Sequence, residues 1–459
     1  MARLAARLFV PGLLVVGALA GAGVAAADEE PQVSGGATAT LGGLATHGQA
    51  VIRKNGEARQ IPAGLFEMSV EGGGTLRTYC IDIDNPTQVD AKYRETSWSA
   101  TSLQANLQAG KIHWILQNSY PQVNDLAELA RKAGAKGLTE ADAAAGTQVA
   151  IWRYSDGADV TATDPQAERL ADYLERSARS LAEPKASLTL DPPAVSGRSG
   201  ERVGPITVHT DARSVTVSPP QDAAASGVKV VGEHGRPVTS AVDGSRLYFD
   251  VPKSAAGTAS LTVQASTSVP VGRAFVAQSR SQTQILAGSS ESTVSATAKV
   301  NWAEEGPVPA LSAERNCAAG GVDITARNQG DEDFTFELMG FEHTIAAGTS
   351  RTVTIPLQED QAYDFTITGP HGFEERFAGV LDCATKTTAS AAQGNDIVPQ
   401  SAPSPATVGG TAGSGHDLAE TGSSNATPVI AGVAVGFVLL GGAVVFLLRR
   451  KGGSGEGDE

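Results

Sequence analysis

The 459-residue chain contains three cysteines, and their positions set one of them apart. Cys317 and Cys383 bracket a stretch of short strand-like segments, and such a pair is expected to form a disulfide in an exported protein. Cys80 is then the odd thiol. A thiol can act as a nucleophile, bind a metal or pack as a small apolar side chain. The chemistry of this chain therefore depends on what faces Cys80.

The sequence around Cys80 does not predict a metal site. The chain has no Cys-x-x-Cys pair, and its seven histidines are scattered, which excludes a zinc site of the usual spacing. Asp82–Asn85 only faintly resembles a calcium loop, because it lacks the glycine and the terminal glutamate of that motif. A turn before Pro86 is the simpler interpretation. We therefore predict neither a metal nor a cofactor.

Two local segments indicate a different chemistry. Tyr79–Asp82 (YCID) lies in a stretch with the alternation of a strand, and Thr147–Trp152 (TQVAIW) lies in a stretch with helical character. A thiol held against a carboxamide can attack its carbonyl carbon, release ammonia and leave a thioester between the two side chains. Near-attack geometry can supply about 7–11 kcal/mol of the barrier to such a reaction. Cys80 and Gln148 are the pair that this reaction requires.

Together, the two segments resemble the paired signatures of thioester domains in Gram-positive surface adhesins. Those signatures are an aromatic-Cys-apolar-acid strand and a downstream T-Q-x-A-apolar-W segment. The resemblance covers about Gly35–Leu181 and implies a β-barrel or sandwich that carries a small helical subdomain. It also implies a Cys80–Gln148 thioester that a lysine amine on a partner opens, leaving an isopeptide bond to Gln148. Such a protein is a single-use reagent rather than an enzyme.

The strand neighbours of Cys80 are expected to support this site. Asp82 shares the face of Cys80 on a strand over Leu76–Ile83, where its carboxylate would orient or polarise the reacting groups. Tyr79 lies on the opposite face and is expected to pack. Both belong to the motif that carries the resemblance.

The helix neighbours of Gln148 are expected to support it as well. Thr147 belongs to the second motif. Trp152 lies one turn beyond Gln148 on the same helix face, where its ring would limit the access of water to the bond. Gly146, which is unfavourable inside a helix, is expected to let this helix approach the strand of Cys80.

Two other interpretations of Cys80 stay open at this stage. One is a structural cell-wall protein in which the same site has not reacted. The other is a secreted hydrolase with Cys80 as nucleophile and His113 as base, although no protease signature surrounds Cys80.

The N-terminus has the parts of a secretory signal peptide. Arg3 and Arg7 supply the positive region, Leu8–Ala20 supplies the apolar region, and Ala25–Ala27 supplies the small-residue cleavage site. Residues 1–27 are therefore expected to be removed on export.

The C-terminus contains a pentapeptide, an apolar segment and a basic tail in that order. The pentapeptide consists of Leu418, Ala419, Glu420, Thr421 and Gly422. Val429–Leu448 is apolar throughout, and a helix of this length would cross a bilayer. The basic residues that begin the tail 449–459 favour a cytoplasmic position for it.

This arrangement resembles the cell-wall sorting signal of Gram-positive bacteria, in the LAxTG form of actinobacteria. It implies that a sortase cleaves after Thr421 and joins this residue to peptidoglycan. The precursor would then be inserted in the membrane, and the mature protein would be displayed on the cell surface.

Between its ends the sequence predicts a mainly β, multidomain chain. Residues 35–183 are expected to form the thioester domain. Residues 185–302 and 307–383 alternate short Val/Thr/Ile runs with Gly/Pro/Ser turns, which is typical of β-sandwiches. Residues 384–417 are rich in Ala, Ser, Thr, Gly and Pro, as in a flexible linker that spans the wall.

The expected helices lie within the first of these domains. The first has an apolar stripe over Leu103–Leu116 that includes Leu107. A short helix follows over Asp125–Lys132. The helix that carries Gln148 begins at a capping box over Thr139–Asp142, and Asp164-Pro165 opens the last helix.

The charge balance limits the class of partner. The chain has 35 Lys and Arg against 50 Asp and Glu, a net charge of −15. This argues against nucleic-acid binding, which needs basic patches. The expected partners are sortase, peptidoglycan and an amine-bearing protein or polymer on another surface.

Overall fold

The computed structural model describes residues 35–220, 223–253 and 256–384. The predicted signal peptide, the linker beyond residue 384, the sorting motif, the apolar segment 429–448 and the tail 449–459 lie outside these residues. Within the described part, no helix combines the length and apolar character needed to cross a membrane. The prediction of a mainly β chain with several sheets is confirmed.

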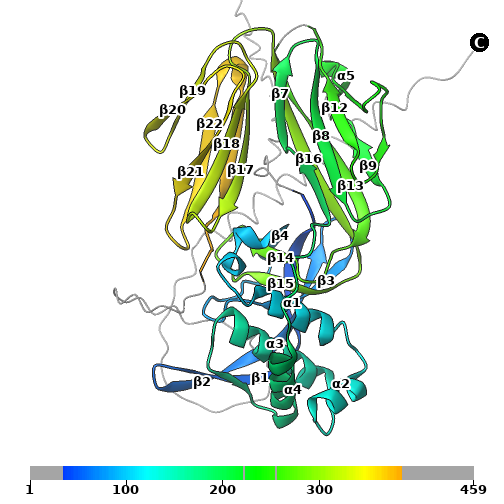
Figure 1. Ribbon diagram of the computed structural model, residues 1–459, viewed down its shortest axis with the longest axis vertical. Coiled ribbons are helices and arrows are strands. Elements are labelled where there is room, and N and C mark those ends of the chain that lie inside the picture. Colours follow the sequence, from blue (N-terminus) through cyan, green and yellow to red (C-terminus); the bar gives the residue numbers. More distant parts are fainter. Residues whose placement is uncertain (1–34, 221–222, 254–255, 385–459) are drawn as a thin grey trace, which may run out of the picture. The chain divides into compact units, whose positions relative to one another are not determined.

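The first sheet closes into a ring of antiparallel strands (Figure 1). In ring order the strands are β2 (Glu57–Val70), β3 (Thr75–Cys80), β15 (Gln284–Ser289), β14 (Ala274–Ala277), β4 (Lys92–Thr96) and β1 (Thr38–Lys54). The long pairing of β1 with β2 closes the ring. β5 (Val160–Ala162) adds to the far end of β1. The ring agrees with the expected barrel.

Strands β14 and β15 come from the stretch that the sequence assigned to the second domain. Ala277 lies opposite Tyr93 on β4, and Gln284 lies opposite Cys80 on β3. The hairpin therefore occupies the middle of the first sheet. The expected boundary at residue 183 does not separate the residues of this sheet from those that follow, because the chain returns to it about 90 residues later.

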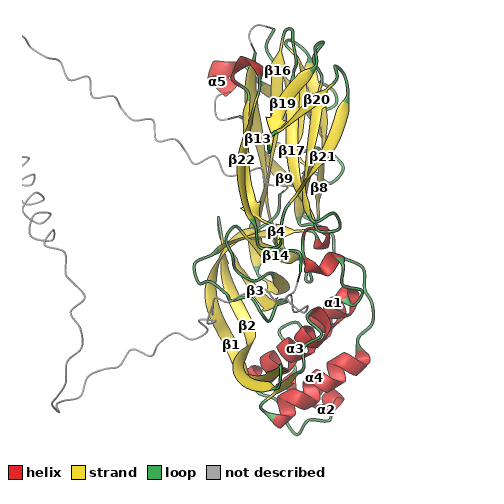
Figure 2. Cartoon of the chain, turned by 90° about the vertical axis from the view of Figure 1, so that its left-hand side faces the viewer, coloured by secondary structure: helices red, strands yellow, loops and turns green. Residues whose placement is uncertain are grey.

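Helices cover one side of this ring (Figure 2). They are α1 (Ala109–Asn118), α2 (Leu126–Ala133), α3 (Glu140–Ser155) and α4 (Pro165–Ser177). α3 packs against β1, β2 and β3 and also against α4. The capping box that begins α3 is present, since the Thr139 hydroxyl accepts from the Asp142 N–H and the Asp142 carboxylate accepts from the Thr139 N–H.

The first expected helix starts later than its apolar pattern suggested. α1 begins at Ala109, after two short 3₁₀ turns, Trp98–Ala100 and Ser102–Gln104. Leu107 was expected in the buried stripe, but it lies in the turn before α1 and is 93% exposed.

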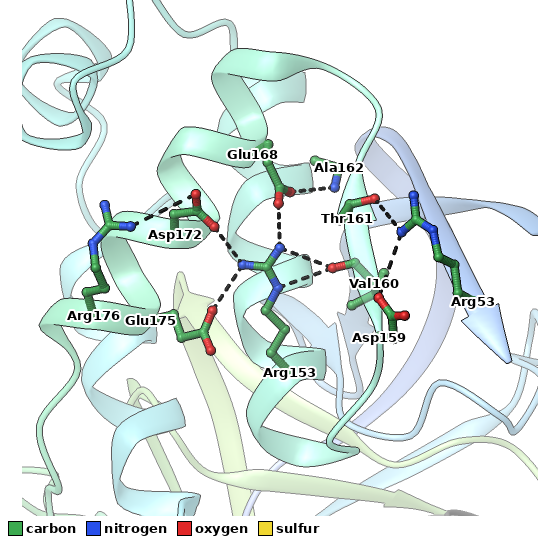
Figure 3. Close-up of polar contacts among 10 residues, drawn as sticks. All are labelled: Arg53, Arg153, Asp159, Val160, Thr161, Ala162, Glu168, Asp172, Glu175 and Arg176. Carbon is green, nitrogen blue, oxygen red and sulfur yellow. Dashed lines mark hydrogen bonds and ion pairs between the residues drawn. The ribbon is translucent and has the colours of Figure 1, made fainter. Parts of the chain in front are cut away.

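A charged cluster fixes α3 to α4 and β5 (Figure 3). The Arg153 side chain, 13% exposed, forms ion pairs with Glu168 at 2.6 Å and with Asp172 and Glu175 at 3.0 Å each. Its guanidinium also donates to the Val160 carbonyl at 3.1 and 3.2 Å. We call these five residues the Arg153 clamp. The clamp sets the position of the helix that carries Gln148.

The residues after Pro184 form a sandwich of two sheets, apart from the β14–β15 hairpin. One sheet contains β10 (Lys229–Val231), β12 (Arg246–Asp250), β8 (Arg202–Thr210) and β6 (Leu188–Asp191). The other contains β11 (Ser240–Ala241), β9 (Val215–Ser218), β13 (Gly257–Ser268), β16 (Glu291–Ala303) and β7 (Ala194–Arg198). A short helix, α5 (Ala223–Ser226), precedes β10. Alternating buried residues of β13 and β16 supply part of the sandwich core.

The third region consists of small antiparallel sheets around its own apolar core. They are β17 (Pro309–Asn316), β18 (Gly321–Asn328) and β21 (Ser350–Pro356); β19 (Phe334–Leu338) and β20 (Phe341–Ile345); and β22 (Ala362–Thr368) and β23 (Glu374–Val380). The predicted Cys317–Cys383 disulfide is confirmed, and it joins the turn between β17 and β18 to the segment after β23.

Candidate functional site

Cys80 is the last residue of β3 and is 1% exposed. The strand was expected to run on to Ile83, but it stops at Cys80, so Asp82 lies in the turn that follows. β2 and β15 flank β3 in the ring. This environment is dry, and burial raises the pKa of the Cys80 thiol to about 12. The sulfur is therefore protonated near neutral pH.

Gln148 lies in the middle of α3 and is fully buried. Its carboxamide meets the backbone of Cys80 at two points. The Cys80 N–H donates to Gln148 Oε1 at 3.0 Å, and Gln148 Nε2 donates to the Cys80 carbonyl at 2.9 Å. The two residues are 68 positions apart in the sequence and are in contact in the fold. The structure thus places both residues in one buried site, but the contact joins the Gln148 carboxamide to the backbone of Cys80 and not to its sulfur.

The two hydrogen bonds hold the Gln148 carboxamide against the backbone of Cys80 and not against its sulfur. Gln148 therefore fixes the position of the residue that carries the thiol.

Gln284 is a third member of the site that sequence reasoning missed. Its Nε2 donates to Cys80 Sγ at 3.1 Å, and its Oε1 accepts from the Thr78 hydroxyl at 3.0 Å. The side chain is fully buried. Gln284 belongs to β15, about 200 residues from Cys80, so neither motif contains it. Only the strand pairing of β3 with β15 places it beside the sulfur.

Asp82 lies close to the reacting pair and is 2% exposed. Its carboxylate accepts from the Asp84 N–H at 3.2 Å and from the side-chain amide of Asn85. Burial, and after it the nearby Asp382 carboxyl, raise the pKa of Asp82 to about 7. Asp82 therefore titrates near neutral pH beside the thiol.

Asp156 is a second buried carboxyl that the motifs did not indicate. It follows the last residue of α3, accepts from the Ile83 N–H at 3.1 Å and bonds to the Ser155 hydroxyl at 2.6 Å. Burial raises its pKa well above the usual range, and the charge of Asp82 adds to this shift. Asp156 ties the end of α3 to the turn that follows Cys80.

The remaining motif residues pack around the pair. The Tyr79 hydroxyl donates to the Tyr120 carbonyl at 2.8 Å, and burial raises its pKa. The Thr147 hydroxyl donates to the Ala143 carbonyl one turn earlier at 2.7 Å. Trp152 is 5% exposed and belongs to the same buried apolar cluster as Cys80. Each contributes to the dry surroundings of the site.

Gly146 does not have the expected neighbour. A Cβ at this position would lie 2.5 Å from the Ala167 carbonyl and 3.1 Å from the Leu170 side chain, both on α4. The expectation that Gly146 admits the Cys80 strand is wrong. Its small size lets α3 approach α4 instead.

His113 is not paired with Cys80. Its Nδ1 bonds to the Ala182 carbonyl at 2.8 Å, and its Nε2 bonds to the Gln117 amide at 2.9 Å. Burial lowers the pKa of the ring. Both nitrogens thus have other partners, and the nucleophile–base pair of a cysteine hydrolase is not assembled here.

Among the described residues, one cluster of three carboxylates has the spacing of a cation site. Oxygens of Glu359, Asp360 and Asp382 lie within 4.8 Å of one another. Glu359 is exposed and the other two are half-buried, and exposed acidic groups commonly approach this closely without a metal.

Comparison with known families agrees with the geometry of the site. Residues 77–180 match the family model described as "Thioester domain", a match that spans both Cys80 and Gln148. Residues 309–380 match the model described as "Bacterial phospholipase C, C-terminal domain". No curated protein sequence matches the chain.

Solved structures with some likeness include three from Gram-positive bacteria. The TIE protein of Bacillus anthracis is 16% identical with a TM-score of 0.27, and the match covers 75% of this chain and 63% of that one. The thioester domain of the Enterococcus faecium TIE86 protein is 14% identical (TM-score 0.28), with coverage of 58% and 97%. The thioester domain of the Staphylococcus aureus TIE protein is 14% identical with a TM-score of 0.22, and the match covers 58% of this chain and 98% of that one.

These TM-scores are too low to support a structural inference. The chain spans less than two thirds of the Bacillus anthracis protein. The match to the thioester-domain family model rests on the sequence of residues 77–180 and does not depend on these structural likenesses. This chain is therefore a mainly β protein that contains a thioester domain.

Proposed function

We propose that this protein is a sortase-anchored surface adhesin of a Gram-positive bacterium, of the actinobacterial type, that captures amines covalently through a thioester between Cys80 and Gln284. The observation that carries the proposal is the contact of the Gln284 amide with the Cys80 sulfur at 3.1 Å, where Cys80 lies inside a segment that matches the thioester domain. The Gln148 carboxamide, which the sequence selected as the partner, bonds instead to the backbone of Cys80 at 3.0 and 2.9 Å and so positions the residue that carries the sulfur.

The thioester forms by loss of ammonia. Cys80 Sγ attacks the Gln284 carbonyl carbon, the carbon–nitrogen bond breaks, and the thiol proton leaves with the nitrogen as ammonia. All groups are neutral before and after the step, so a buried site can hold them without a compensating charge. The Thr78 hydroxyl, which donates to Gln284 Oε1 at 3.0 Å, supports the oxygen on which charge develops.

Capture reverses the roles of sulfur and nitrogen. An unprotonated lysine amine of the partner attacks the same carbon, the carbon–sulfur bond breaks, and the amine proton passes to the departing sulfur. The products are an isopeptide bond to Gln284 and a free Cys80 thiol. Because the protein is consumed, it acts once and is a reagent rather than an enzyme.

The terminal signals supply the location in this proposal. The leader directs export, the apolar segment holds the precursor in the membrane, and sortase joins Thr421 to peptidoglycan. The sandwich regions and the linker would carry the thioester domain away from the wall. The partner is a protein or polymer that exposes primary amines.

Intact-mass measurement of the secreted ectodomain Asp28–Thr421 tests the proposal. We expect a mass below the formula value by one ammonia, and mild methylamine treatment should add one methylamine at Gln284. Cys80→Ala and Gln284→Ala should each abolish both changes and leave the disulfide intact. A full formula mass, with Cys80 freely alkylated in untreated folded protein, would show an unreacted site and contradict the proposal.

A further inference from the structure

The third region contacts the first domain directly beside Gln284. The Thr283 hydroxyl donates to Asp382 Oδ2 at 3.0 Å. Thr283 directly precedes Gln284 at the start of β15 and is 2% exposed, whereas Asp382 follows β23 in the third region. The two residues are 99 positions apart in the sequence, and neither lies in residues 77–180, which match the thioester domain.

The position of Thr283 affects both reacting groups. Its carbonyl accepts from the Ile81 N–H at 3.2 Å, and Ile81 directly follows Cys80. Its neighbour on the other side is Gln284, whose amide contacts the sulfur at 3.1 Å. Thr283 therefore lies where the segment that carries the thiol meets the segment that carries the carboxamide. A shift at Thr283 changes the distance from the sulfur to the carbonyl carbon.

The Asp382 carboxylate belongs to a segment that is itself fixed. The neighbouring Cys383 forms the disulfide with Cys317, whose N–H donates to the Ser99 carbonyl of the first domain at 3.3 Å. The Glu359 carboxylate accepts from the Cys383 N–H at 2.8 Å. A cross-link and a backbone hydrogen bond thus hold Asp382 in the third region, and the cross-link itself lies next to the first domain.

Thioester formation is sensitive to small displacements. It requires near-attack geometry, with the reacting atoms about 3–3.5 Å apart, and a displacement of about 1 Å can slow such a reaction about a hundredfold. Burial and the nearby Glu359 carboxyl raise the pKa of Asp382 to about 6, so the group is ionised above neutral pH. A hydroxyl that donates to a carboxylate forms a stronger bond than one that donates to a neutral acceptor.

We infer that Asp382 is a positioning residue for the thioester: by accepting from the Thr283 hydroxyl, it fixes the start of β15 and holds the Gln284 carbonyl carbon within reach of the Cys80 sulfur. This inference rests on the proposed function. The ring contains the reacting pair, and the third region sets how readily the pair joins.

Re-closure of the thioester in the intact ectodomain measures this effect. Ammonia attacks the Gln284 carbonyl carbon and breaks the carbon–sulfur bond, which restores the carboxamide and the Cys80 thiol. After ammonia is removed, intact mass follows the loss of one ammonia as the bond forms again. Asp382→Ala removes the acceptor, and Thr283→Val removes the donor and keeps the branched shape. Each should re-close about tenfold more slowly than wild type.

Three further variants sharpen the test. The double variant Asp382→Ala, Thr283→Val should be no slower than either single variant, because both remove the same hydrogen bond. Asp382→Asn keeps an acceptor oxygen and should retain most of the wild-type rate. Asp331→Ala is the matched control, since Asp331 also lies in the third region but pairs with Arg198 of the sandwich, at 3.1 Å. It should re-close at the wild-type rate.

The outcomes separate the inference from the proposed function. Ammonia loss in wild type, with wild-type re-closure in both single variants, would overturn the inference and leave the proposed function standing. Equal slowing in Asp331→Ala, or in Asp382→Asn and Asp382→Ala, would also overturn it. A wild-type protein without ammonia loss would overturn both. If re-closure is too slow to follow, the fraction of freshly purified molecules that lack one ammonia decides, and it should be lower in the two single variants.

Discussion

Helix α3 carries two polar clusters of opposite character. Gln148 meets neutral groups, namely the backbone of Cys80, while Arg153 meets three carboxylates of α4. The charged cluster is the more exposed of the two, since Gln148 is fully buried and the Asp172 side chain is 42% exposed. The same helix therefore holds a buried amide on one side and an ion-pair network on another.

The difference shows how position and reactivity are divided. Paired charges resist displacement, because a displaced partner leaves a charge poorly solvated. Neutral groups carry no such constraint and can be fully buried once they are hydrogen-bonded. The Arg153 clamp thus fixes α3 through charges, and the Gln148 carboxamide fixes the backbone of Cys80 through neutral hydrogen bonds.

Breaking the clamp should give the largest change in stability. Arg153→Met leaves Glu168, Asp172 and Glu175 without their shared cation and should lower the free energy of unfolding by about 2 kcal/mol, the reduced cost of a partly exposed network. Urea unfolding measures this loss. The more exposed Arg176, 3.9 Å from Asp172, is the control, and Arg176→Met should cost at most about 0.5 kcal/mol. Equal losses in the two variants would show that the clamp has no special role.

The pH dependence of stability should report on the buried Asp82 carboxyl near Cys80. The folded pKa of Asp82, about 7, is above its ordinary value of 3.8. The folded state therefore holds this proton more tightly, and the resulting stability is present at low pH and lost as the pH rises through 7. Asp82→Asn should reduce the fall in melting temperature between pH 5 and pH 8. An unchanged slope in this variant would contradict the buried, neutral carboxyl.

The cap of α3 should give the smallest effect. Thr139→Ala removes the hydroxyl that accepts from the Asp142 N–H at 3.1 Å and should cost about 1 kcal/mol of unfolding free energy. Thr139→Ser retains the acceptor and should restore most of this loss. Capture of methylamine per folded molecule should stay at the wild-type rate, because the cap lies more than two turns from Gln148. A slower capture would mean that the start of the helix also positions the amide.

That Cys80 and Gln148 lie in one site was predictable from sequence, because each lies in a short contiguous motif. The helix that carries Gln148 was also predictable, since its cap and apolar spacing are local. Gln284 was not, because its contact with Cys80 depends on a strand pairing across 204 residues. Buried runs such as Ala274–Ala277 have the same pattern in a barrel as in a sandwich, so the pattern could not say which sheet they join.

The neighbours of α3 show a second limit. The spacing of residues along a helix gives the face on which Gly146 lies, but not the element that approaches that face. Likewise, the sequence placed Asp82 on a strand, whereas the chain turns after Cys80 and brings Asp82 and Asp156 to the same loop. Local patterns identify chemical groups, and tertiary packing decides which of them meet.

The hairpin of β14 and β15 limits how the domains of this chain can be exchanged, in evolution or in protein engineering. Since it lies between β3 and β4, the first two regions are interleaved and cannot be exchanged as separate cassettes. A graft that ends near residue 183 would leave a gap in the ring and lose the amide beside the sulfur. The smallest transplantable unit is therefore the whole of Gly35–Ala303.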